Sequence, residues 1–201
     1  RSLPQESPQL AARRESVEAD VPVDSIYMAF HGPDRHHDDY YTLDLVSDLL
    51  SRGSSSRLYR ALVKEQQLFV DVNAYLMGSV DTNLFVVEGK PSEGVDLTQA
   101  EQALWEQLDR LKTELVAEKE LEKVKNKVES TMVFAELSIL DKAMNLAYFE
   151  LLGDANAYNT EVAKYAAISN SDIQRVSAEI FRAENSSTLI YHAKNQEAHV
   201  G

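Results

Sequence analysis

The chain has 201 residues, a net charge of −13 and no cysteine. This length is enough for one domain with a substantial core. The negative charge disfavours nucleic acid and anionic membranes as partners. The absence of cysteine excludes disulfides, thiolate zinc ligands and a cysteine nucleophile. No stretch approaches the roughly 18 apolar residues of a membrane helix, so we expect a soluble protein.

The first residues predict a linker and not a folded element. Residues 1–12 include Pro4 and Pro8, are largely polar, and lack both an initiator methionine and the apolar segment of a signal peptide. We therefore expect a fragment of a longer protein, with one domain over residues 13–193 and a loose tail over 194–201.

The first half of the domain predicts strands flanking helices. A strand is expected near 13–19, and a second over 24–31, where apolar side chains alternate. A helix is expected from Asp38 and Asp39 to about Leu50, ended by Gly53. Next we expect a short helix capped by Ser54 to Ser56, then two strands forming an antiparallel hairpin. The strand near 70–77 alternates, with Val70 and Val72 on the same face, and the strand near 82–89 contains a continuous apolar run that predicts burial on both faces.

The second half predicts mostly helices. Leucines at helical spacing indicate a helix near 97–116, and nine apolar positions indicate one long helix over 118–152, with Gly153 at its end. Two shorter helices and a final strand follow, near 157–167, 171–182 and 187–192. Ser169 to Asp172 resembles a helix cap with an acidic residue three positions on, before the second of these helices. The predicted fold is α+β, with a mostly antiparallel sheet and long helices packed on one face.

Four sequence pieces occur in an order that resembles the C-terminal, non-zinc domain of the pitrilysin-type zinc metallopeptidases. That family includes insulin-degrading enzyme and mitochondrial processing peptidase. The match extends over about residues 15–193. The pieces are Pro33 with Asp38-Asp39-Tyr40-Tyr41, the loop Gly53–Tyr59, the helix end Ala147–Asp154, and the helix Ser169–Val176.

The resemblance implies two similar domains around a closed chamber. The N-terminal domain would carry zinc on His-x-x-Glu-His and a distal glutamate, with the motif glutamate as general base. None of the five histidines of this chain has that spacing. We therefore expect no catalytic residue and no metal ligand here, and zinc only in an N-terminal half of the parent protein, in the bacterial cytoplasm or periplasm.

The C-terminal domain of this family often supplies an arginine and a tyrosine, seven residues apart, that help to hold the substrate carbonyl. The matching positions here are Val63 and Val70, which carry no side-chain donor. Arg52 and Tyr59 are also seven apart, but they precede the helix and are a poor substitute. The resemblance implies that residues 63–77 face the chamber.

Candidate peptide-contact residues are Arg57, Val63, Phe69 and Val70. For Arg57, a structural role at a helix end is favoured over a place in the chamber wall. A separate cluster, His31, His36, His37, Asp38 and Asp39, has metal-ligating residue types but matches no metal motif. A polar turn before a helix is the favoured interpretation.

The leading hypothesis is the non-catalytic half of a zinc-dependent metallopeptidase subunit, forming part of a peptide-binding chamber. Its expected partners are the homologous N-terminal domain of the same chain, a peptide substrate, and a second subunit carrying the arginine–tyrosine pair. The alternatives are an inactive structural homologue, comparable to the core subunits of respiratory complexes, and an unrelated acidic binding module.

Overall fold

The computed structural model describes residues 7–194 and contains a five-stranded sheet in the order β1-β5-β2-β4-β3. Neighbouring strands are antiparallel except β1 and β5, which run parallel. The predicted α+β fold, its mostly antiparallel sheet and the β3–β4 hairpin are confirmed. The strands are β1 (Arg13–Ala19), β2 (Ser25–Gly32), β3 (Phe69–Leu76), β4 (Asn83–Pro91) and β5 (Ser186–Ala193).

Alternation along the strands determines which sheet face is buried. Ile26, Met28 and Phe30 of β2 are fully buried, and the residues between them are only half-buried. In β4, Val86 on the opposite face is buried together with Phe85 and Val87, as predicted for a continuous apolar run.

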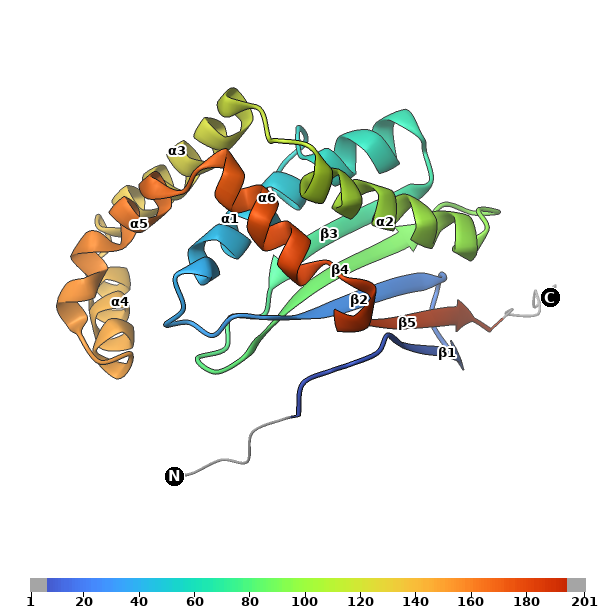
Figure 1. The fold of residues 1–201 in the computed structure, drawn as a ribbon, viewed down its shortest axis with the longest axis horizontal. Coiled ribbons are helices and arrows are strands. Elements are labelled where there is room, and N and C mark those ends of the chain that lie inside the picture. Colours follow the sequence, from blue (N-terminus) through green and yellow to red (C-terminus); the bar gives the residue numbers. More distant parts are fainter. Residues whose placement is uncertain (1–6, 195–201) are drawn as a thin grey trace, which may run out of the picture.

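Three helices cover one face of the sheet: α1 (Asp39–Ser51), α2 (Leu97–Thr113) and α6 (Asn170–Ile180). Figure 1 shows them on the same side of the strands, and α6 packs against both α1 and α2. The predicted cap of α6 is confirmed, because Ser169 and Asp172 form a reciprocal capping box. α1 ends as predicted before Gly53, whose φ is 86°.

The prediction of one long helix over 118–152 is wrong. The chain forms α3 (Glu118–Ala135) and α4 (Ile139–Leu151), with a break at 136–138. At the break, Leu137 and Ser138 donate backbone hydrogen bonds to carbonyls three residues back, and the Ser138 hydroxyl accepts from the Asp141 amide to cap α4. Serine often competes with the helical ladder in this way, and apolar periodicity does not reveal it.

After α4 the chain forms η2 (Ala155–Thr160) and α5 (Glu161–Ala167). We call residues 139–167 the helical arm, because Figure 1 shows these helices extending past the sheet. A buried ion pair between Arg35 and Glu161 joins the arm to the loop before α1. The Tyr41 hydroxyl accepts from Arg35 at 2.9 Å and donates to Glu161 at 3.0 Å.

This buried network keeps the arm in place. Burial alone would lower the pKa of Arg35, but its hydrogen bond to Tyr41 and the Glu161 carboxylate together raise it above the ordinary value. A second bond runs from the Tyr165 hydroxyl on α5 to Asp44 on α1, at 2.7 Å. The arm is thus attached to α1 mainly through polar and aromatic contacts.

At the ends of the domain, Gln9 donates a side-chain hydrogen bond to the Ser186 carbonyl, next to the short helix η3 (Ala183–Asn185). Residues 7–12 of the predicted linker form no helix or strand, whereas residues 1–6 and the predicted tail beyond Lys194 lie outside the described residues. Within residues 7–194, no helix is both long and apolar enough to cross a lipid bilayer.

Candidate functional site

The segment between α1 and β3 contains η1 (Tyr59–Glu65), a π-helix. The Gln66 amide donates to the Ala61 carbonyl five residues back, at 3.0 Å. The prediction that Ser54 to Ser56 cap this helix is wrong. The helix start makes no side-chain cap, and the buried Ser56 hydroxyl finds no protein partner among residues 7–194. Short π-helical turns are frequent at functional sites.

Arg57 lies at the start of this segment and has a structural partner. Its Nε and Nη2 donate to the two carboxylate oxygens of Glu120 on α3, both at 2.8 Å. This two-pronged hydrogen bond raises the pKa of Arg57, although burial opposes the shift. The arginine therefore ties the start of η1 to α3, in line with the favoured structural interpretation.

Phe69 and Val70 are neighbours with opposite surroundings. The register of β3 shifts between Phe69 and Asp71, which marks a bulge. Phe69 is 1% exposed, whereas Val70 is 69% exposed. The expectation that Val70 shares the buried face of Val72 is therefore wrong, because the bulge rotates it outward.

Gly89 of β4 makes room for the buried phenylalanine. A Cβ at Gly89 would lie 2.5 Å from the ring of Phe69, so only glycine fits there without displacement. The Phe69 side chain contacts the core and is not available to a peptide in this structure, contrary to its place among the candidate contact residues.

Val63 lies on η1, half-buried against the core, and η1 packs against β3. Of the four candidate residues, Val70 is therefore the one with a largely exposed side chain. Arg52, of the alternative pair, bonds Asp48 one helical turn away, at 3.0 Å. Tyr59 has the Lys64 ammonium 5.5 Å from its ring centroid. Both members of the substitute pair thus have local partners.

The histidine–aspartate cluster forms a turn, as the favoured interpretation predicted. Asp34 accepts backbone hydrogen bonds from His36 and His37, at 2.8 and 3.1 Å. The Asp39 carboxylate is hydrogen-bonded by Arg175 of α6, which lowers the pKa of Asp39. Over the described part of the chain, no three His, Asp or Glu side chains are grouped so as to hold a metal ion. These residues do not fit zinc, and we assign them no metal-dependent step.

Comparison with known protein families identifies the family of this chain. Residues 1–128, more than half of the chain, match the family described as "Peptidase M16 inactive domain". The chain therefore belongs to this family, and the resemblance to the non-zinc domain of the pitrilysin-type peptidases is confirmed.

Three similar proteins illustrate the family. The zinc protease PqqE of Helicobacter pylori is 27% identical over 187 residues, which are 92% of this chain but 42% of that protein. A solved protease from H. pylori has a TM-score of 0.86 and 22% identity, over 96% of this chain and 47% of its own. An inactive peptidase domain from Bordetella parapertussis has a TM-score of 0.76 and 23% identity, over 84% of this chain and 91% of its own.

The chain thus spans less than half the length of the two H. pylori proteins. With the Bordetella domain it shares the fold over nearly the whole of both chains. It is a non-catalytic domain of a zinc-protease family.

Proposed function

We propose that the chain is the C-terminal half of a metallopeptidase subunit and forms part of the wall of a peptide-binding chamber. Zinc and its ligands would lie in an N-terminal half of the parent protein. The main support is that the chain belongs to the inactive-domain family and corresponds to 42% of a zinc protease that is similar to it over 92% of the chain.

The exposed side chains of the helical arm are evidence that it contacts another polypeptide. Large apolar residues are exposed around its start and along α4, and Leu140, Met144 and Leu151 repeat at helical spacing. Solvent-facing apolar stripes of this kind are typical of contact surfaces. The homologous N-terminal domain is the proposed occupant. The exposed residues are Val133, Phe134, Leu137, Ile139, Leu140, Met144 and Leu151.

The position of β3 at the edge of the sheet is evidence that this strand faces the peptide. Among residues 7–194 it is the last strand of the sheet, with β4 as its single strand neighbour, and it exposes Val70 and Tyr75. An edge strand offers backbone donors and acceptors to an extended peptide. Because Val63 and Val70 lack donors, this wall would bind a peptide through shape and backbone, and charge stabilisation would come from the zinc domain or a partner subunit.

The test uses the full-length parent protein, alone and mixed with a homologue that carries the arginine–tyrosine pair. Zinc content is measured by elemental analysis, and peptidase activity with a quenched peptide. We expect stoichiometric zinc, with activity that depends on the mixture. Hydrolysis by the isolated 201-residue chain in the presence of a chelator would contradict the proposal.

A pair of variants tests the peptide-facing edge. Val70→Glu in the active protein should lower kcat/KM about tenfold, which corresponds to about 1.4 kcal/mol. The matched control is Val17→Glu, an exposed valine on β1, the strand at the opposite edge of the sheet. Equal effects of the two changes would remove β3 from the chamber wall.

The second candidate function is an inactive assembly protein, favoured by the valines at both donor positions. It predicts no zinc in the full-length protein, alone or in the mixture, and an unchanged activity of any catalytic partner. Zinc content therefore separates the two functions.

A further inference from the structure

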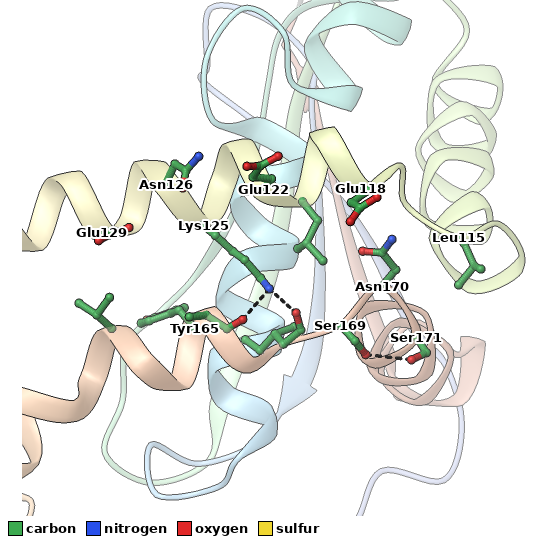
Figure 2. A pocket seen from close by; sticks show the side chains of 14 residues that line it. Leu115, Glu118, Glu122, Lys125, Asn126, Glu129, Tyr165, Ser169, Asn170 and Ser171 are labelled. Carbon is green, nitrogen blue, oxygen red and sulfur yellow. Dashed lines mark hydrogen bonds between the residues drawn. The ribbon is translucent and has the colours of Figure 1, made fainter.

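A groove of about 690 Å³ lies between the first half of α3, the end of α5 and the start of α6. Figure 2 shows α3 running along one side, with Tyr165 and Ser169 on the other. Apolar side chains contribute to its lining, among them Leu121, Val162 and Ile168. This volume is within the usual range of ligand pockets, and the groove uses none of the residues 63–77.

Three carboxylates line the groove from α3. Glu118, Glu122 and Glu129 are separated by four and seven residues, which places them on one side of the helix. All three are exposed. Within residues 7–194 the side chains of these three glutamates form no ion pair and no hydrogen bond.

The groove already holds one cationic group, the ammonium of Lys125. By spacing it lies among the three carboxylates, yet its ammonium donates to the Ala166 carbonyl at 2.8 Å and also to the Ile168 carbonyl (Figure 2). These carbonyls lie at the end of α5, where a helix is partially negative. Among the described lining residues Lys125 is the single cation, so the carboxylates of the groove outnumber its bound ammonium.

We propose that this groove binds a basic, amphipathic polypeptide segment. Its apolar side chains would pack on Leu115, which is 62% exposed, and on the half-buried Val162. Its lysine or arginine side chains would pair with Glu118, Glu122 and Glu129. The proposal rests on charge complementarity together with a partly apolar lining, and it goes beyond the chamber wall because the groove is lined by none of the residues 63–77.

The experiment uses a fluorescent peptide of about 14 residues, roughly four helical turns, with lysines spaced i,i+4 between leucines. Binding to the 201-residue chain is followed by fluorescence polarisation, and the site by amide NMR shifts. We expect shifts at Leu115, Glu122 and Val162. The triple variant Glu118→Gln, Glu122→Gln, Glu129→Gln should bind about tenfold more weakly.

The control variant removes the same charge elsewhere: Glu15→Gln and Glu18→Gln on β1 with Glu93→Gln after β4, all three exposed. It should retain binding within about twofold at about 0.15 M salt, where distant charges are screened. A loss equal to that of the groove variant would overturn the proposal in favour of attraction by net charge. Equal binding of the same peptide with glutamates for lysines, or NMR shifts confined to β3, would overturn it as well.

Discussion

The first half of α3 and the helix α4 carry the same kind of apolar stripe, yet only one of them is buried. Leu121, Val124 and Val128 of α3 pack in the core. On α4, Leu140 is 68% exposed and Met144 is 62% exposed. Helical periodicity therefore predicts the helix in both places, but it does not tell whether the apolar face meets this domain or another surface.

The two regions also differ in what attaches them. α3 contributes aliphatic side chains to the core that the helices share with the sheet, whereas the helical arm is held by Arg35, Tyr41 and Glu161, and by Tyr165 with Asp44. Buried charges contribute little net stability when paired but cost much when one partner is lost. Replacing polar residues should therefore destabilise the attachment of the arm most strongly, whereas replacing apolar residues should destabilise the core most strongly.

The largest expected effect comes from Arg35→Ala, which leaves the Glu161 carboxylate buried without its partner. We expect the free energy of unfolding to fall by about 3–5 kcal/mol. Urea denaturation measures the loss, and hydrogen exchange should show earlier opening of residues 139–167 than of β2. The control is Arg14→Ala, whose ion pair with Glu101 is more exposed and should contribute less than about 1 kcal/mol.

Leu121→Ala and Met144→Ala compare the two stripes directly. Leu121 is 4% exposed, so its truncation should cost about 3 kcal/mol in urea denaturation. The exposed Met144 should cost less than about 0.5 kcal/mol. Equal losses would show that the α4 stripe is buried within this chain.

Ser138→Ala tests the break between the two helices. Loss of its cap to the Asp141 amide should cost about 1 kcal/mol. Ser54→Ala is the matched control, because Ser54 is exposed and η1 has no side-chain cap. A neutral result for Ser138→Ala would mean that the break is imposed by packing of the arm and not by the cap.

The smallest expected effect is a pH dependence at Asp44. Burial raises the pKa of this carboxyl, against the hydrogen bond from Tyr165. The folded state thus holds the proton more tightly than the unfolded state, and the contribution of Asp44 to stability falls as pH rises above about 3.9 through the folded pKa.

An asparagine side chain in place of this carboxyl cannot ionise but can still accept from Tyr165. The substitution Asp44→Asn should therefore gain stability relative to the natural chain as pH rises from about 4 to 7, by less than about 1 kcal/mol. Urea denaturation across this range measures it. A variant that loses relative stability over the same range would show that the folded state favours the carboxylate.

Local patterns in the sequence were sufficient for most elements of the fold. Alternation placed β2, a continuous apolar run placed β4, helical spacing placed α2, and the Ser169–Asp172 cap placed the start of α6. These features depend on residues a few positions apart. The absence of the zinc motif and of donors at Val63 and Val70 was likewise readable without a structure.

Features that depend on distant residues required the tertiary structure. Phe69 is buried because Gly89 on the neighbouring strand leaves room for its ring, and the bulge that follows turns Val70 outward. Arg57 is satisfied by Glu120, 63 residues away in the sequence, and the groove exists only because α3, α5 and α6 converge. Short-range periodicity reports which faces are apolar, whereas the packing of remote elements decides which of those faces become core and which remain surface.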